Sequence, residues 1–243
     1  MIYSQRTSCK YCNVFHYILY FNSIMNSVVV YMFLFFGLFF FIYFNSFANR
    51  ECFSNKLNLI FLGDSIFKND TYVSENKSVG DLLKKYYGSD IVKIYAEDGA
   101  TIYDMPEQIS SIKSKKKYNN NNTHIFVSFG GNDIIENFID FVTGVTLEEL
   151  FKDYKKGLFK LKTRLPDAKI HLATIYYPKD TPYYNYYNII EAWNNKIMHY
   201  AKKNKLSVIR LDKFFKTQAD FTHSIEPSFK GGNIILDRVK KLT

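Results

Sequence analysis

The sequence predicts an α/β domain, with a five-stranded parallel sheet covered by helices on both faces. Two observations predict this fold. From residue 57 onward, short apolar runs alternate with amphipathic stretches of roughly ten or more residues, an order typical of parallel strands buried from both sides. The same part of the chain contains no cysteine, so it must rely on a hydrophobic core rather than on disulfides. Residues 57–243 have about the length of one ordinary domain.

The strands are predicted from short apolar runs that turn residues interrupt. The first run ends at Gly63, and the third stops at the pair Gly130-Gly131, because glycine suits the backbone of a turn. In chain order, the five strands are predicted at residues 57–62, 91–96, 125–129, 170–176 and 207–211.

The helices are predicted from apolar residues that recur every three or four positions. The clearest is 146–165, where these residues form one stripe and Thr146 with Glu149 provides a capping box at the start. Gly88 closes the first helix, as glycine often does. In chain order, the helices are predicted at residues 79–87, 102–112, 146–165, 186–203 and 231–241.

An apolar segment precedes the domain. Residues 28–44 carry no charged side chain, and their number approaches the roughly 20 apolar residues that span a bilayer. We therefore expect a transmembrane anchor or a signal segment at 28–48, after a tail at 1–27 and before a linker at 49–56. Cleavage after Ala48 is the alternative to a retained anchor, because Ser46 and Ala48 are small residues of the kind that a signal peptidase reads. Either outcome places the domain at 57–243 on the non-cytoplasmic side, membrane-bound or secreted.

Charge and cysteine content exclude several kinds of partner. The chain has 32 Lys and Arg against 23 Asp and Glu, but the basic residues are scattered and no nucleic-acid motif accompanies them, so no nucleic-acid partner is expected. Cys9 and Cys12 are spaced like half a zinc site, yet no second pair or His cluster completes it. Asn69, Asn76 and Asn121 begin glycosylation sequons, which matter only on a luminal domain in a host that glycosylates.

Polar residues gather where three predicted strands end, and the carboxyl ends of parallel strands share one edge of a sheet. The three segments are Gly63-Asp64-Ser65, a loop with Gly99, and Gly130-Gly131-Asn132-Asp133. Ser65 is placed to attack a carbonyl carbon, while the backbone N–H groups of Ser65 and Gly99 and the Asn132 amide are available donors for an oxyanion. Asp64 is expected to support the turn beside Ser65, and Asp133 to cap the following helix.

In their order and spacing, these segments resemble the blocks of the SGNH (GDSL-type) hydrolase superfamily. The resemblance extends over about residues 57–240. It implies a flavodoxin-like three-layer α/β/α sandwich and ester hydrolysis through an acyl-enzyme, with no metal and no cofactor. It also implies that Ser65 is the nucleophile and that Gly99 and Asn132, together with the Ser65 amide, form the oxyanion hole.

The final block allows two interpretations. In one, Asp220-x-x-His223 is the expected pair, in which His223 accepts the Ser65 proton and Asp220 orients it. In the other, the run from Glu226 to Gly231 fits the His-Pro-x-x-x-Gly pattern of the superfamily, with Glu226 in the place of the histidine. Chemistry favours His223, because a carboxylate with a reference pKa of about 4.3 is a poor base for a serine hydroxyl. Glu226 stays open as a substitute or supporting group.

Together these observations predict a membrane-anchored or secreted serine esterase that acts on a small ester, an O-acylated glycan or a lipid. Two alternatives remain open: a catalytically inactive binding domain for a glycan or lipid, and a lysophospholipase or acyltransferase working at the membrane surface. Tyrosines between residues 176 and 187 are expected at the rim of the site, where they either contact a substrate or pack on one another.

Overall fold

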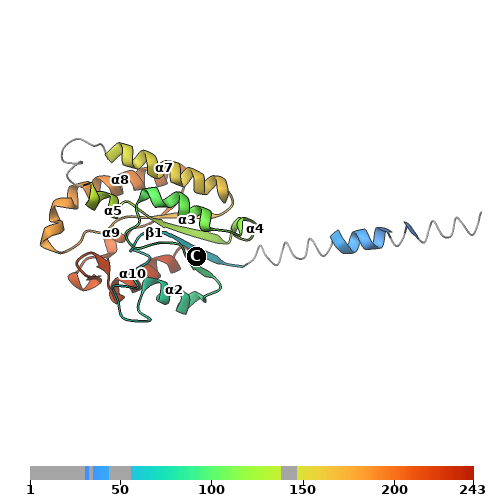
Figure 1. Cartoon of the computed structure of the whole chain (residues 1–243), viewed down its shortest axis with the longest axis horizontal. Coiled ribbons are helices and arrows are strands. Elements are labelled where there is room, and N and C mark those ends of the chain that lie inside the picture. The colour runs from blue at the N-terminus through green and yellow to red at the C-terminus, as the bar shows by residue number, and fades with distance from the viewer. Residues whose placement is uncertain (1–30, 33–34, 44–55, 138–146) are drawn as a thin grey trace, which may run out of the picture. The chain divides into compact units, whose positions relative to one another are not determined.

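A computed structural model describes residues 31–32, 35–43, 56–137 and 147–243 (Figure 1). The chain divides into two units, Met1–Phe53 and Ser54–Thr243. In the first unit, the described residues are helical and their side chains are exposed. No helix among the described residues combines the length and the apolar character that crossing a membrane requires. The predicted anchor or signal segment at 28–48 falls partly outside the described residues, and the predicted tail at 1–27, with Cys9 and Cys12, falls wholly outside them.

The second unit is built on a five-stranded parallel sheet, which confirms the predicted fold class. The strands lie in the order β2-β1-β3-β4-β5, and every neighbouring pair is parallel. This is the strand order of flavodoxin-like folds. The strands are β1 (Asn58–Gly63), β2 (Val92–Ile94), β3 (Thr123–Ser128), β4 (Lys169–Ala173) and β5 (Ser207–Ile209).

Helices cover both faces of the sheet, so the unit has three layers (Figure 1). One face packs against α3 (Met105–Ser111), α7 (Leu147–Arg164) and α8 (Tyr187–Asn204). The other face packs against α2 (Val79–Tyr87) and α10 (Phe229–Lys240). Successive residues of a strand point to opposite faces, and the core follows this rule: Leu59 and Phe61 belong to one cluster, Ile60 and Leu62 to the other.

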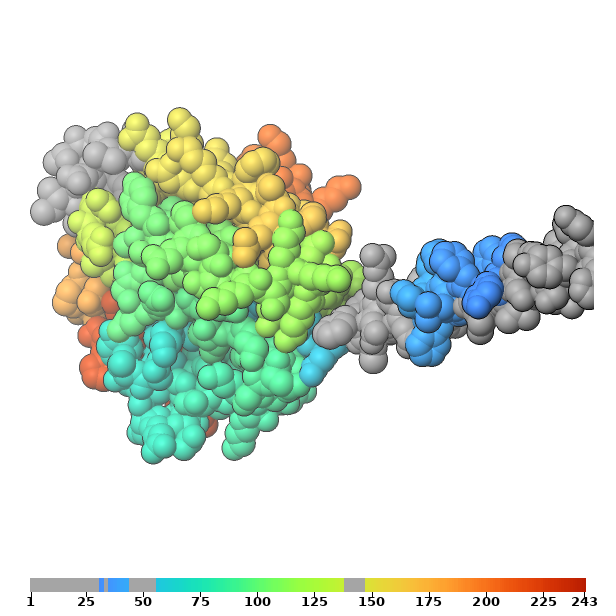
Figure 2. Space-filling view, turned by 45° about the vertical axis from the view of Figure 1, so that its right-hand side comes forward, coloured from blue at the N-terminus to red at the C-terminus, as the bar shows by residue number. Residues whose placement is uncertain are grey.

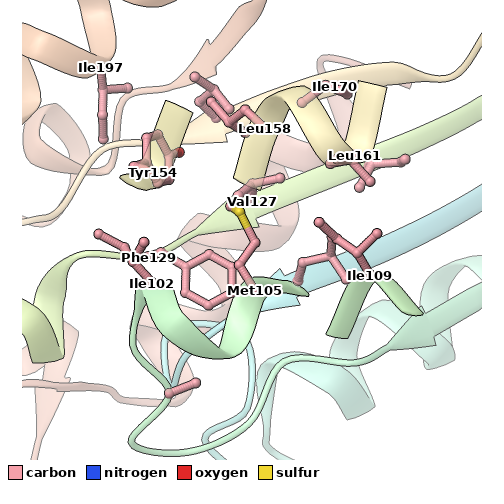
Figure 3. Close-up of a cluster of buried hydrophobic side chains, with 14 of the residues drawn as sticks. Ile102, Met105, Ile109, Val127, Phe129, Tyr154, Leu158, Leu161, Ile170 and Ile197 are labelled. Carbon is pink, nitrogen blue, oxygen red and sulfur yellow. The ribbon is translucent and has the colours of Figure 1, made fainter. Parts of the chain in front are cut away.

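The cluster under α7 is shown in Figure 3, where Met105 of α3 lies against side chains of α7. Gly157 makes this close packing possible, because a Cβ atom at that position would lie 2.0 Å from the Met105 sulfur. A side chain at position 157 would therefore displace either the buried Met105 side chain or α7 itself.

Shorter elements complete the unit, and most of them lie outside the predicted pattern. The predicted helix at 102–112 is a 3-10 turn, η1 (Ile102–Asp104), followed by α3, because Pro106 occupies the first turn of α3 and sets where that helix begins. A small antiparallel pair, β6 and β7, follows β5 and precedes α10. The remaining elements are α4 (Lys115–Tyr118), α5 (Gly131–Glu136), η2 (Thr181–Tyr186), α9 (Leu211–Phe214), η3 (Gln218–Asp220), β6 (Phe221–Thr222) and β7 (Glu226–Pro227).

Candidate active site

A pocket opens at the carboxyl edge of the sheet, where the predicted site residues were expected to meet. Its polar lining consists of Asp64, Ser65, Asn132 and Glu226. Most of the remaining wall is aliphatic or aromatic and comes from α5, α8, the loop after β4 and the turn before β7. These wall residues are Ile66, Ile134, Ile135, Ile175, Tyr176, Pro178, Tyr183, Tyr186, Ile190 and Ile225. Polar groups that could react thus face an apolar chamber.

Ser65 directly follows β1 and is held by a tightly built turn. Gly63 has a φ of 140°, and a Cβ atom there would lie 2.0 Å from the Ser128 carbonyl oxygen, so only glycine fits. The Gln108 side chain bonds both backbone groups of Gly63, accepting from its N–H at 2.7 Å and donating to its carbonyl at 2.8 Å. The turn therefore fixes the position of Ser65, which is itself buried.

Asp64 supports the same turn from inside the protein. Its carboxyl accepts from the Ser128 hydroxyl at 2.9 Å and from the Ile66 N–H at 3.2 Å. Burial raises the pKa of Asp64 to about 7, although these two hydrogen bonds lower it in part.

Asn132 lies in the first turn of α5 and faces the same pocket. Its side-chain amide donates to the Ala100 carbonyl at 2.9 Å, which leaves the second N–H of the amide to point elsewhere. Gly99, next to Ala100, has a φ of 75°. Gly99 is exposed and does not line the pocket, within the part of the chain that the structure describes. The Asn132 bond nevertheless ties the Gly99 loop to α5.

Asp133 lies within the first turn of α5 rather than at its N-cap, which is Gly130. The predicted capping role is therefore not what the structure has. Both carboxyl oxygens of Asp133 accept from the Ile102 N–H at 3.2 Å. Burial raises the pKa of Asp133 to about 6. Asp133, like Asn132, tethers α5 to the loop that contains Gly99.

The structure does not bring Asp220 and His223 together. The Asp220 carboxyl forms an ion pair with Lys230 at 2.7 Å and accepts from the N–H groups of Lys216 and Thr217. His223 is exposed, has a φ of 42°, and lies 3.2 Å from the Thr222 hydroxyl through Nδ1. His223 does not line the pocket, as far as the described residues show. Asp220 thus organises the η3 turn instead of orienting an imidazole.

Glu226 is the residue that faces Ser65. Its carboxyl is buried and lines the pocket beside Ser65, and Oε2 has no hydrogen-bond partner in the described part of the chain. Burial raises the pKa of Glu226 to about 7; the interaction with the Ser65 side chain lowers it and the charge of Asp98 raises it further. The reason is that an apolar surrounding disfavours the ionised carboxylate. The objection that a carboxylate is too weak a base does not hold for a group with this pKa.

A second layer of contacts joins the loops around the site, and no motif predicted it. The Tyr72 hydroxyl donates to the Asp98 carboxylate at 2.8 Å, and this bond raises the pKa of Tyr72 to about 12. The Tyr72 ring also lies 5.5 Å from the His223 ring, measured between centroids. Tyr72 therefore links the Gly99 loop with the turn that precedes Glu226. The one feature of the sequence that could have pointed to this contact is that Asp98 lies next to Gly99.

The tyrosine-rich stretch after β4 divides between the two roles that were considered. Tyr176, Tyr183 and Tyr186 line the pocket. Tyr187 packs against Tyr177 and Tyr184, with ring centroids 5.1 and 5.4 Å apart.

No metal-binding group was found in this part of the molecule. No cluster of three or more His, Cys, Asp or Glu side chains suited to a metal ion occurs among the described residues. His124 and His171 stack on each other in β3 and β4 with 3.0 Å between Nδ1 and Nε2, away from the pocket. Burial lowers the pKa of both to about 4, which keeps them neutral at physiological pH.

Comparison with protein families decides the assignment. The model of the GDSL-like lipase/acylhydrolase family matches residues 61–228. The chain belongs to this family. As a GDSL-like acylhydrolase it is an ester-hydrolysing enzyme, and the matched range contains Ser65, Gly99, Asn132 and Glu226. A search of curated proteins finds no match.

Solved structures share the GDSL-like fold at low sequence identity. A lipolytic G-D-S-L family protein from Veillonella parvula DSM 2008 is 17% identical, with a TM-score of 0.60 and coverage of 77% of this chain and 98% of that one. A phospholipase A1 from Streptomyces albidoflavus NA297 is 12% identical (TM-score 0.57, coverage 76% and 99%). An acetyl xylan esterase variant from Geobacillus stearothermophilus is 15% identical (TM-score 0.53, coverage 76% and 93%). Their shared architecture supports the fold of the second unit.

Proposed function

We propose that this domain hydrolyses a carboxylic ester or O-acyl group through an acyl-enzyme on Ser65, with Glu226 as the general base. The observation that carries the proposal is the position of the buried Glu226 carboxyl, which lines the same pocket as Ser65 and interacts with its side chain. Burial raises the pKa of this carboxyl to about 7. A base whose pKa lies near the operating pH is partly ionised and still basic enough to take a proton in the transition state.

The chemistry follows from this pair. Glu226 accepts the Ser65 proton as Oγ attacks the carbonyl carbon, and negative charge develops on the carbonyl oxygen. The Ser65 N–H and the free N–H of the Asn132 amide are the donors proposed to stabilise that oxyanion, while the loop with Gly99, tied to Asn132 through the Ala100 carbonyl, holds the amide in place. Glu226 then returns the proton to the departing alcohol. A water molecule, deprotonated by the same carboxylate, hydrolyses the acyl-enzyme and restores Ser65.

The pocket favours a substrate without negative charge. Its lining is largely apolar and contains two carboxyl groups, Asp64 and Glu226, and no Lys, Arg or His among the described residues. An anionic acyl group would lack a cationic partner there, and its burial next to these carboxyls would be unfavourable. A neutral ester with an apolar part fits better, and both an O-acylated glycan and a lipid meet that condition.

The decisive test is an esterase assay with purified full-length protein in detergent, using neutral p-nitrophenyl esters and a fluorophosphonate probe. Ser65→Ala should lower kcat by roughly 10⁴-fold or more and abolish labelling. Ser110→Ala is the matched control, because Ser110 is an exposed serine on α3. If Ser65→Ala stayed as active as Ser110→Ala, the Ser65 mechanism would be refuted. An inactive wild type that still binds acylated glycans or lipids would instead make the domain a binding module.

We also propose that the apolar segment at 28–48 directs the domain to a membrane or to secretion. Its composition supports this, since residues 28–44 are free of charge. Alkaline carbonate extraction of the expressed protein, with N-terminal sequencing of the mature form, separates a retained anchor from cleavage after Ala48. A full-length protein extracted into the soluble fraction would argue against both.

A further inference from the structure

The basic residues that are scattered in the sequence gather at the amino edge of the sheet. In a parallel α/β fold, each helix ends where the next strand begins, so the ends of α4, α7 and α8 lie along the start of β3, β4 and β5. Lysines crowd these ends, and the Arg164 guanidinium donates to the Ile112 carbonyl at 2.7 Å, which joins the end of α7 to the end of α3, just before α4. The exposed members are Lys113, Lys115, Lys116, Lys162, Lys169, Lys202, Lys203 and Lys205. We call these eight residues the basic edge.

The basic edge is not neutralised within the domain. None of its eight lysines forms an ion pair with another described residue, whereas lysines elsewhere, such as Lys68 and Lys230, do. Asp167, the carboxylate beside it, accepts from the Asn119 amide at 2.8 Å. Lysines at helix ends complement the helix dipole, but that effect accounts for one or two per helix, not for an unpaired row across three.

The carboxyl edge holds the carboxyl groups of the pocket, Asp64 and Glu226, and the exposed loop acids Glu97 and Asp98. The candidate active site thus lies at one edge of the sheet, and the basic edge lies at the other. Figure 2 shows the ends of α7 (yellow), α4 (green) and α8 (orange) on the same side of the domain.

We propose that the basic edge binds the headgroups of anionic phospholipids at a membrane surface. One observation favours a membrane over another polyanion: the domain begins at this edge. Asn58, the first residue of β1, pairs with Thr123 at the start of β3, so the apolar segment at 28–48 precedes, in the chain, the edge that carries the lysines. Phe159 of α7 is exposed and lies three residues before Lys162, so a ring on which bases could stack is present, and an oligouridylate arm in the test distinguishes the two polyanions.

The arrangement has a consequence for the enzyme. With the basic edge against a bilayer, the pocket at the carboxyl edge faces away from it, because the two edges are opposite ends of the same parallel strands. The enzyme would then take its ester from the aqueous side rather than from the bilayer that holds it. Each lysine near an anionic leaflet is expected to raise partitioning roughly fivefold, so a few of the eight suffice to hold the domain in place.

The test measures lysine protection in the full-length protein. The protein is mixed with vesicles of phosphatidylcholine alone or with 30% phosphatidylserine as the chosen composition, and accessible lysines are acetylated and quantified by mass spectrometry. We expect protection of the basic edge of at least about fivefold only with phosphatidylserine, reversed by high salt. Lys77, Lys213 and Lys216 are exposed residues elsewhere on the domain and serve as internal controls that should stay reactive.

Charge reversal completes the test. The variant Lys115→Glu/Lys116→Glu/Lys202→Glu/Lys203→Glu should lose protection at the remaining edge lysines, while Lys77→Glu/Lys216→Glu should keep it. Because all these side chains are exposed, unchanged melting temperatures are expected to show intact folding. Equal protection by phosphatidylcholine alone, protection of the control lysines, or no protection at all would overturn the proposal. So would protection by an oligouridylate at concentrations where phosphatidylserine vesicles give none.

Discussion

Ser65 and Asn132 are positioned by the parallel sheet, whereas Glu226 is positioned by a strand of two residues. Ser65 follows β1, which pairs with β2 on one side and β3 on the other, and Asn132 begins the helix after β3. Glu226 belongs to β7, whose partner β6 offers it a single opposite residue, Thr222. The five-stranded sheet therefore fixes the positions of Ser65 and Asn132, whereas the position of Glu226 depends on the β6–β7 hairpin alone.

This difference explains why the structure places Glu226, and not His223, beside Ser65. Thr222 and Glu226 are paired across the hairpin, so His223 falls in the turn beyond the ladder. His223 and Ser224 both adopt a positive φ, 42° and 68°, which directs that turn to solvent. A displacement of three residues along a hairpin therefore decides which side chain reaches Ser65. In a sheet of five parallel strands, no such displacement is available.

The largest expected effect is the loss of the base. Glu226→Gln keeps the size of the side chain but cannot take the Ser65 proton, so kcat should fall by roughly 10²- to 10⁴-fold. His223→Ala should change kcat less than about threefold, since His223 is exposed and outside the pocket. Steady-state kinetics on a neutral p-nitrophenyl ester measure both. The reverse ranking would return the base to His223 and show that the hairpin rearranges in solution.

Removing the oxyanion donor should have the next largest effect. Asn132→Ala deletes a donor and also frees the Ala100 carbonyl, to which the amide donates at 2.9 Å. We expect kcat to fall by roughly 10²- to 10³-fold with a smaller change in KM. Asn188→Ala, an exposed asparagine on α8, is the control and should behave as wild type. If both variants were equally active, Asn132 would be a tether for the Gly99 loop and nothing more.

The position of Asn132 could be predicted from the sequence, whereas the role of Glu226 could not. The helix at Val79–Tyr87 has the predicted ends, because the Ser78 and Asp81 side chains form a capping box and Gly88 closes it. Such signals depend on neighbouring residues alone and can be recognised in the sequence. The sheet and the positions of Ser65 and Asn132 could also be predicted, because strand ends carry them.

The role of Glu226 could not be predicted in the same way, because it depends on burial. From sequence, a glutamate has a pKa near 4.3 and is a poor base for serine; inside the pocket the value is about 7. The β6–β7 hairpin was also invisible, since two-residue strands leave no periodic pattern. Tyr72 reaches Asp98 across 26 positions of the chain, and no spacing rule connects them.

A smaller effect concerns the pH dependence. Because Glu226 must be ionised to act as base, kcat/KM should rise with pH through about 7, the pKa of that carboxyl. Asp98→Asn removes a charge that raises this pKa while keeping an oxygen acceptor for Tyr72, so the midpoint should move to lower pH by roughly half a unit to one unit. Glu75→Gln, an exposed acid in the loop before α2, should leave it in place. A midpoint that Asp98→Asn leaves unmoved would mean that the titrating group is not Glu226.

The smallest effect on catalysis, but a measurable one on stability, is expected from the other buried carboxyl. The pKa of Asp64 is about 7 in the folded protein against a reference value of 3.8. A raised folded-state pKa stabilises the protein below the unfolded value, and this contribution is lost as pH rises towards 7. Wild type should therefore lose on the order of 2 to 4 kcal/mol of unfolding free energy from Asp64 between pH 4 and pH 8.

Asp64→Asn separates the two regions by this measure. An asparagine can still accept from Ser128 and Ile66 through its amide oxygen, so the variant should be more stable than wild type at pH 8 and similar to it at pH 4. Urea titrations at both pH values test this. Glu226, whose pKa is also about 7, would keep part of the pH dependence in that variant, and only Asp64→Asn/Glu226→Gln should remove both contributions. If the double variant showed the same pH dependence as Asp64→Asn alone, Glu226 would titrate near its reference pKa, and the hairpin would hold it in water rather than against Ser65.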